Sequence, residues 1–170
     1  MTMEEINSLT QAQFVATFAG IYEHSPWVGE RAWAGRPFGT LDNLCAQMQQ
    51  QVEAASREEQ LALIRAHPDL GTRARVSPSS ADEQSSVGLD RLTPEEYDQL
   101  LRLNTAHKQK FAFPFIFAVK GSDKHTILAA LERRLRSAPE EEFGEALRQI
   151  HQIARFRLAE VLERAAKRTS

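Results

Sequence analysis

Residues 139–162 read PEEEFGEALRQIHQIARFRLAEVL and carry the longest helical pattern in the chain. Pro139 suits the first position of a helix, where a backbone N–H is not needed. The apolar residues that follow recur every three or four positions, which is the repeat of one helical face. They are Phe143, Leu147, Ile150, Ile153, Ala154, Leu158, Val161 and Leu162. The segment therefore predicts a long helix that buries this face.

Helix-start signals recur through the rest of the chain. Thr10, Thr40, Ser56 and Thr93 each stand where an N-cap precedes an apolar helical repeat. The predicted helices run from Thr10 to before Ser25–Pro26, over residues 27–33, from Thr40 past Val52, from Ser56 to near His67, over residues 80–87, from Thr93 to Phe111, and from Ser122 to Leu135. Ile21 and Tyr22 are expected on the apolar face of the first helix, and Cys45 is expected as a core thiol.

Residues 113–119, FPFIFAV, form the one window that looks extended. A single apolar run of this kind has no obvious strand partner, so we predict a buried connector between helices. At 170 residues and 42% hydrophobic content, the chain suits one domain with a real core. We therefore expect an all-α fold, in which residues 1–170 form a single compact multi-helix domain.

Composition excludes several classes of partner. Lys and Arg total 21 against 23 Asp and Glu, so no basic excess is available to bind nucleic acid. A single cysteine excludes an internal disulfide framework and a Cys-based zinc cluster. We find no apolar run of about 18 residues and no secretory signal pattern, so no membrane association and a cytoplasmic location are expected.

Polar residues gather where the chain is least regular, in and around the Gly- and Ser-rich connection after His67. They are His67, Asp69, Ser80, Glu83 and Gln84. Functional groups favour such loops. Two plainer interpretations stand beside a functional one: His67 ends a helix before Pro68 and could be a simple C-terminal cap, and the S-x-x-E spacing of Ser80 and Glu83 is that of a capping box.

Arg157 stands on the apolar face of the last predicted helix, four residues after Ile153 and four before Val161. One interpretation is that its guanidinium extends to water along its aliphatic stem. The other is that it points into a pocket and holds a carboxylate by two parallel hydrogen bonds. Position alone does not choose between them.

Metal and nucleotide cofactors are not expected. The five histidines include no HExxH pair, and a site made of His67, Asp69 and Glu83 would be speculative. The chain has no Gly-x-Gly-x-x-Gly motif and no phosphate loop, and an all-helical pattern lacks the strand that both motifs need.

An ordered set of motifs resembles the OHCU decarboxylase family, whose name abbreviates 2-oxo-4-hydroxy-4-carboxy-5-ureidoimidazoline decarboxylase. The motifs are EHSPWV at 23–28, RPF at 36–38, HPDL at 67–70, SADEQ at 80–84 with Gly88–Leu89, FPFI at 113–116, and Ile153–Ala154 with Arg157–Leu158. They span nearly the whole chain and keep the order of the family. The ordered set, rather than any single motif, carries the resemblance.

The resemblance implies an all-α, cofactor-independent enzyme that acts third in the route from urate to S-allantoin, after urate oxidase and hydroxyisourate hydrolase. It implies His67 and Glu83 as catalytic residues. The residues that it implies for substrate binding are Pro68, Ser80, Gln84, Phe113, Phe115, Ile116 and Arg157. It also implies a ureidoimidazoline substrate, a homodimer, and functional coupling to the hydroxyisourate hydrolase.

The chemistry implied by the resemblance explains why no cofactor is needed. The leaving carboxylate sits beside a ring C=N that accepts the electron pair, and the enol-like product must then gain a proton on one face. We expect His67, with an ordinary pKa of about 6.5, to hydrogen-bond or deprotonate the substrate hydroxyl while Glu83 orients it. Which of the two manages the later proton transfer, and which substrate atom Arg157 contacts, stay open.

Two positions depart from the family pattern, since His107 stands where the family has Tyr and Ala112 where it has Gly. An alanine would strain a backbone that needs positive φ, and we assign His107 no role.

Two rival functions are also defined. The first is a helical binding or regulatory module without turnover, in which replacing His67 or Glu83 leaves ligand affinity intact. The second is a metal hydrolase that uses His67, Asp69 and Glu83 and that chelation would inactivate.

Overall fold

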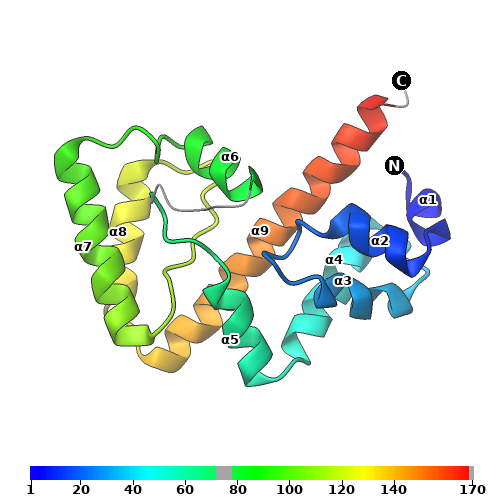
Figure 1. The fold of residues 1–170 in the computed structure, drawn as a ribbon, viewed down its shortest axis with the longest axis horizontal. Coiled ribbons are helices and arrows are strands. Elements are labelled where there is room, and N and C mark those ends of the chain that lie inside the picture. The colour runs from blue at the N-terminus through cyan, green and yellow to red at the C-terminus, as the bar shows by residue number, and fades with distance from the viewer. Residues whose placement is uncertain (72–77, 169–170) are drawn as a thin grey trace. The chain divides into compact units, whose positions relative to one another are not determined.

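Helices make up the regular secondary structure of the residues that this computed structural model describes, 1–71 and 78–168 (Figure 1). They are α1 (Met3–Ser8), α2 (Gln11–Phe18), α3 (Trp27–Ala32), the short 3-10 helix η1 (Trp33–Gly35), α4 (Leu41–Glu53), α5 (Arg57–Arg65), α6 (Pro78–Ser86), α7 (Pro94–Phe111), α8 (Lys124–Arg134) and α9 (Pro139–Arg168). The all-α prediction is confirmed. None of the helices in this part of the chain is long and apolar enough to cross a membrane.

The chain divides into two compact units. The first unit is Met1–Leu63 with His151–Ser170, and the second unit is Ile64–Ile150. The boundaries between them fall within α5 and within α9. Whether all 170 residues unfold as one domain stays a prediction, which the number of unfolding transitions would test.

The predicted N-caps hold the starts of the helices. The Thr10 and Thr93 hydroxyls accept hydrogen bonds from backbone N–H groups three residues on, and both helices have complete capping boxes. Ser56 Oγ accepts from the Glu59 N–H at 3.1 Å. Two starts were predicted wrongly. Helix α6 begins at Pro78 and not at Ser80, and α8 is capped by Asp123 and not by Ser122. Asp123 has extended backbone geometry, and its carboxylate accepts from the Thr126 N–H at 2.9 Å.

The N-terminal part of the first unit differs from the prediction in two ways. Residues 3–8 form α1, which is started by a Thr2–Glu5 capping box and buries Ile6. Helix α2 ends at Phe18, so Ile21 and Tyr22 lie beyond it, although both are buried. Hydrophobic spacing alone does not distinguish a helix from a tight turn that buries the same residues.

Tyr22 anchors the interior of the first unit through a contact with α9. Its hydroxyl lies 2.9 Å from His151 Nδ1, and burial raises the pKa of Tyr22 and lowers the pKa of His151. Burial therefore favours the neutral form of both groups, in which the phenol O–H donates to the imidazole.

Cys45 is only half-buried, so it is not the core thiol that its helical position suggested. Burial nevertheless raises the pKa of its thiol.

The second unit has an apolar core built from α7, α8 and the chain segments on either side of them. Its buried members are Leu70, Leu89, Leu100, Phe115, Val119, Ile127, Leu128, Ala130 and Leu131. Helices α7 and α8 pack against each other and are joined by a Lys124–Glu96 ion pair of 2.7 Å. Together, hydrogen bonds from Lys124 and from the Thr93 N–H lower the pKa of Glu96 to about 2.

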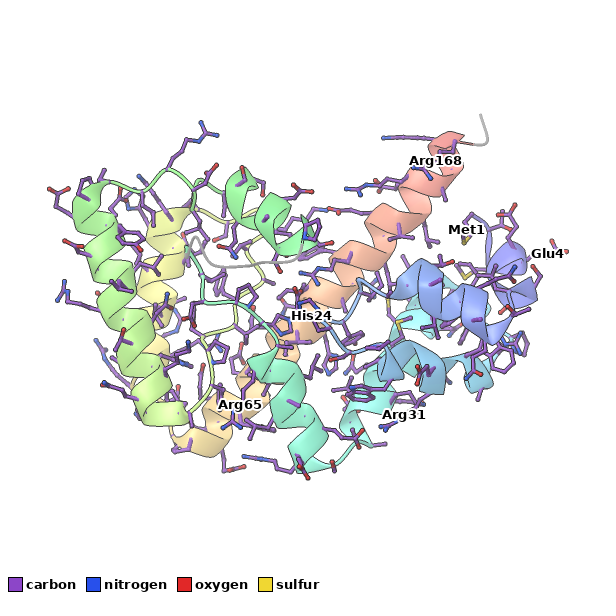
Figure 2. The ribbon with its side chains drawn as sticks, viewed as in Figure 1. Met1, Glu4, His24, Arg31, Arg65 and Arg168 are labelled. Carbon is purple, nitrogen blue, oxygen red and sulfur yellow. The ribbon has the colours of Figure 1, made fainter. Side chains whose placement is uncertain are left out.

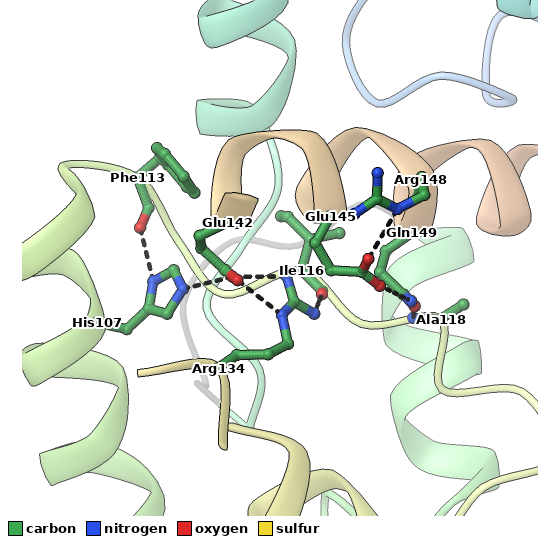
Figure 3. Close-up of polar contacts among 9 residues, drawn as sticks. All are labelled: His107, Phe113, Ile116, Ala118, Arg134, Glu142, Glu145, Arg148 and Gln149. Carbon is green, nitrogen blue, oxygen red and sulfur yellow. Dashed lines mark hydrogen bonds and ion pairs between the residues drawn. The ribbon is translucent and has the colours of Figure 1, made fainter. Parts of the chain in front are cut away.

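Residues 113–119 form the predicted connector, with no strand partner among the described residues. Side chains of the surrounding helices bind its backbone polar groups instead (Figure 3). His107 Nδ1 lies 3.0 Å from the Phe113 carbonyl oxygen, and Gln149 Oε1 accepts from the Ala118 N–H at 2.9 Å. Arg134 donates to the Ile116 carbonyl oxygen. These bonds explain how an extended segment can be buried outside a sheet.

Ala112 ends α7 in the left-handed conformation, with φ of +62°. Because Cβ disfavours this conformation and glycine does not, Ala112→Gly is expected to raise the free energy of unfolding by about 0.5–1 kcal/mol. Ala106→Gly, at an exposed position inside the same helix, is the control and is expected to lower it by about 1 kcal/mol. Urea unfolding measures both, and destabilisation by Ala112→Gly would contradict the assigned geometry.

Candidate active site

The residues predicted to form the site fall in both units. His67, Pro68, Ser80, Glu83, Gln84 and the 113–116 segment belong to the second unit, and Arg157 belongs to the first. In the second unit, His67, Ser80 and Gln84 are buried, with exposed fractions of 7%, 5% and 8%. Polar side chains are buried when they have partners or a function, so these three are informative.

His67 stands where its sequence neighbours predicted, two residues after the end of α5. Its N–H donates to the Ile64 carbonyl oxygen at 3.2 Å, which closes the last turn. Arg65, the last residue of α5 (Figure 2), donates through Nε to the Ala112 carbonyl oxygen at 3.0 Å. This bond ties the end of α5 to the end of α7. The exit of α5, and the position of His67 with it, is thereby anchored within the second unit.

Ser80 and Glu83 do not form a capping box at a helix start. Helix α6 begins at Pro78, so Ser80 is its third residue and cannot be its N-cap. A proline suits the first helical position, which accounts for the earlier start. Ser80, Glu83 and Gln84 lie three and four residues apart and share one face of α6, where Glu83 is half-buried. The helix therefore presents three polar side chains on its more buried face.

Gln84 contacts the segment that follows His67. Its Oε1 accepts a hydrogen bond from the Gly71 N–H at 2.8 Å, and Asn104 Nδ2 of α7 donates to the Leu70 carbonyl oxygen at 3.0 Å. Asn104 was not predicted as a site residue. A polar side chain on the Leu100–Phe111 apolar face of a helix was the signal that could have identified it.

Gly71 has φ of +73°, and a Cβ there would stand 2.3 Å from Leu100 Cδ2. Gly71→Ala therefore adds a steric clash to the backbone strain, whereas Gly88→Ala, at φ of +81° with nothing within 4 Å, adds strain alone. We expect Gly71→Ala to be the more destabilising by about 1–3 kcal/mol in urea unfolding. Equal losses of stability in the two variants would show that the Leu100 side chain moves aside at no cost in free energy.

The 113–116 segment is held by a buried charged network that the sequence did not reveal (Figure 3). Glu142 of α9 accepts from Arg134 of α8 at 2.6 and 3.0 Å, and its Oε1 lies 2.8 Å from His107 Nε2 of α7. Glu142 and His107 are fully buried, and Arg134 is 5% exposed. His107 thus acquires a structural role beside the expected pocket wall, because it bonds Phe113 through its other ring nitrogen.

Arg157 is buried within the first unit, with 4% of its side chain exposed. Its Nη1 donates to Glu23 Oε2 at 2.8 Å and to the Gly20 carbonyl oxygen at 3.1 Å. The interpretation in which Arg157 extends to water is therefore wrong. The guanidinium does hold a carboxylate, which is that of Glu23. The same nitrogen, Nη1, donates to this carboxylate and to the Gly20 carbonyl oxygen.

Arg157→Lys tests this geometry. Lysine keeps the charge, but its ammonium is more strongly hydrated than a guanidinium, so burying it beside the carboxylate and the carbonyl costs more free energy. We expect the free energy of unfolding to fall by about 1–2 kcal/mol, measured in urea. Arg155→Lys is the matched control, because Arg155 pairs with Asp42 at an exposed position and should tolerate the change. An unchanged stability of Arg157→Lys would contradict the prediction.

The three residues of the speculative metal site do not form one. Asp69 pairs with Lys108 at 2.8 Å. Within residues 1–71 and 78–168, no three His, Cys, Asp or Glu side chains gather so that they could hold a metal ion. The structure thus gives the metal-hydrolase hypothesis no group of ligands in this part of the chain.

Comparison with known proteins gives consistent matches along the chain. Residues 7–159 match the family model described as OHCU decarboxylase. A Haloferax volcanii protein named 2-oxo-4-hydroxy-4-carboxy-5-ureidoimidazoline decarboxylase is 47% identical, over 94% of this chain and 95% of that protein. A uric acid degradation bifunctional protein from Bacillus subtilis is 45% identical, over 95% of this chain and 33% of that protein. The crystal structure of an (S)-allantoin synthase has a TM-score of 0.77 at 35% identity, and the match covers 95% of this chain and 54% of that chain.

Proposed function

We propose that this chain, which belongs to the OHCU decarboxylase family, removes CO2 from 2-oxo-4-hydroxy-4-carboxy-5-ureidoimidazoline and forms S-allantoin without a cofactor. The family match over residues 7–159 supports the reaction, as does the likeness to an (S)-allantoin synthase. The observation that carries the proposal to particular residues is the burial of His67, Ser80 and Gln84 in the second unit.

His67 and Glu83 are the proposed catalytic pair. His67 hydrogen-bonds or deprotonates the substrate hydroxyl, and Glu83 orients it. The bond from the ring carbon to the carboxylate breaks, and its electron pair moves into the adjacent C=N as CO2 leaves. The enol-like intermediate then gains a proton on one face of the neighbouring carbon from one member of the pair. Delivery to a single face is what makes the product chiral.

The proposed substrate ligands have complementary chemistry. Ser80 and Gln84 offer polar contacts from α6, and Arg157 binds an anionic or carbonyl oxygen. Pro68, Phe113, Phe115 and Ile116 supply apolar surface and backbone groups for the ring. A firm hold on the departing carboxylate would stabilise the ground state, so binding energy is better directed at oxygens that stay with the product.

Optical activity of the product tests the proposed reaction. Because the substrate decays spontaneously, it is generated in place from urate by urate oxidase and hydroxyisourate hydrolase. We expect prompt formation of S-allantoin when the protein is added, and slow formation of racemic allantoin without it. Racemic product at the spontaneous rate in both samples would overturn the decarboxylase assignment and favour the binding module without turnover.

Assembly and location belong to the same proposal. We expect a homodimer, which sedimentation equilibrium measures, and a cytoplasmic location. The large apolar side chains exposed in the described residues are Tyr97 and Leu101 of α7 and Phe156 of α9. The relative named as a bifunctional protein of uric acid degradation supports coupling to a second activity of that route, and we expect the hydroxyisourate hydrolase as the partner. Pull-down between the two proteins tests that coupling.

A further inference from the structure

The Leu70–Gly71 peptide bond, in the segment that follows His67, is bound at both of its polar groups by side-chain amides from different helices. The Leu70 carbonyl oxygen accepts from Asn104 Nδ2 of α7 at 3.0 Å, and the Gly71 N–H donates to Gln84 Oε1 of α6 at 2.8 Å. These two groups belong to the same peptide plane. Both amide side chains are buried, with exposed fractions of 5% for Asn104 and 8% for Gln84.

The chemistry of the peptide determines which way each amide faces. A carbonyl oxygen can only accept, so the nitrogen of Asn104 must face Leu70. A backbone N–H can only donate, so the oxygen of Gln84 must face Gly71. The Gln84 NH2 group therefore faces away from Gly71, and Gln84 can meet a further group there only as a hydrogen-bond donor. The amide orientation, which is usually assigned by inspection, is here dictated by the partners.

We propose that Asn104 is a positioning residue that holds the Leu70–Gly71 peptide against Gln84, so that Gln84 offers its NH2 group to a carbonyl or carboxylate oxygen of the substrate. The inference rests on the proposed function and deepens it, because it gives Gln84 a donor role and identifies the residue that enforces it. Asn104 does not itself contact the substrate in this scheme.

The surroundings of Asn104 argue against a simple packing role. It occupies an apolar face of α7 between Leu100 and His107, where a leucine of similar volume would bury more apolar surface. Its Oδ1 is buried with no hydrogen-bond partner among the described residues, which is a cost that an apolar side chain would avoid. Leu100 closes on Gly71 so tightly that no Cβ fits there. The peptide thus lies against α7 on two contacts, one polar and one apolar.

Hydrogen exchange at the Gly71 amide tests the positioning step without reference to activity. In the full chain, we expect Asn104→Leu to accelerate exchange at Gly71 by about tenfold, because the peptide loses one of its two anchors. Gln84→Leu should accelerate it similarly, whereas Gln84→Glu should leave it protected, since a carboxylate still accepts from the N–H. Unchanged exchange in Asn104→Leu would overturn the positioning role.

Kinetics test the donor step. Gln84→Glu keeps the contact with Gly71 but has no NH2 group, so kcat/KM should fall about tenfold or more. Wild-type kcat/KM in Gln84→Glu would overturn the donor role, and this result is readable even where Asn104→Leu fails to fold. If Asn104 acts through Gln84, the Asn104→Leu and Gln84→Leu losses should be non-additive in the double variant. Additive losses would show independent roles and overturn the proposal.

The two levels of the proposal fail in different ways. Racemic product at the spontaneous rate from the wild type would remove the proposed reaction, while the exchange pattern at Gly71 would still report on the positioning step. Stereospecific product from the wild type together with full activity of Gln84→Glu would keep the reaction and remove the donor role.

Discussion

Replacing His67 with alanine is expected to lower kcat/KM by about 10²- to 10⁴-fold, the range for loss of a positioned acid or base. The product should become largely racemic, because the spontaneous reaction then outpaces the impaired enzyme and no group delivers a proton to one face. His67 is 7% exposed and follows α5 within the second unit, so the change removes a buried, anchored side chain. Polarimetry on the coupled urate assay measures both effects.

His125→Ala is the matched control for this experiment. His125 lies on α8 of the same second unit, but its side chain is exposed, so its loss should leave the rate and chirality unchanged. Far-UV circular dichroism and urea unfolding establish that both variants are folded. Stereospecific product at near wild-type rate from folded His67→Ala would exclude His67 as the central catalytic group and favour its interpretation as a helix cap.

Replacing Arg134 with leucine is expected to lower the free energy of unfolding by about 3–5 kcal/mol, the cost of breaking a buried ion pair from one side. Arg134 binds both carboxylate oxygens of Glu142 and the Ile116 carbonyl oxygen (Figure 3). Its guanidinium also lies 4.6 Å from the centre of the Phe115 ring. The variant leaves a fully buried carboxylate with His107 as its remaining neighbour in this network.

Arg133→Leu provides the control, because Arg133 is the exposed neighbour on the same helix and should be near neutral. The double variant Arg134→Leu with Glu142→Leu should recover part of the loss, since it removes the stranded carboxylate as well. Urea unfolding measures all three. If Arg134→Leu lowers the free energy of unfolding no more than Arg133→Leu does, the network does not hold the connector.

Local sequence signals predicted most of the helices because a helix start depends on residues only a few positions apart. Thr93 caps α7 through a backbone N–H only three residues away, and Pro139 begins α9 without any distant contact. The missed α1 has the same kind of capping box, Thr2 with Glu5, but only one buried residue to reveal its apolar face. The error at α8 arose between two adjacent capping residues, of which Asp123 makes the bond.

The candidate site was predicted in part. The position of His67 after α5 and the burial of Ser80 and Gln84 agree with their selection from sequence, although their catalytic and binding roles stay predictions. Glu142 and Arg134 were overlooked because a charged residue beside an apolar face is usually solvated. Only the meeting of α7, α8 and α9 places both of them in the interior.

The amino-acid sequence by itself determined the helical class and most of the helix starts, since these depend on neighbours within a few positions, and it also contains the ordered motifs of the family. Tertiary structure alone decided that Glu142 joins Arg134 and His107, and that Asn104 and Gln84 share one peptide bond. Partners in these bonds lie 8 to 35 residues apart. Hydrogen bonds between such residues depend on how helices pack, which periodicity within one helix does not specify.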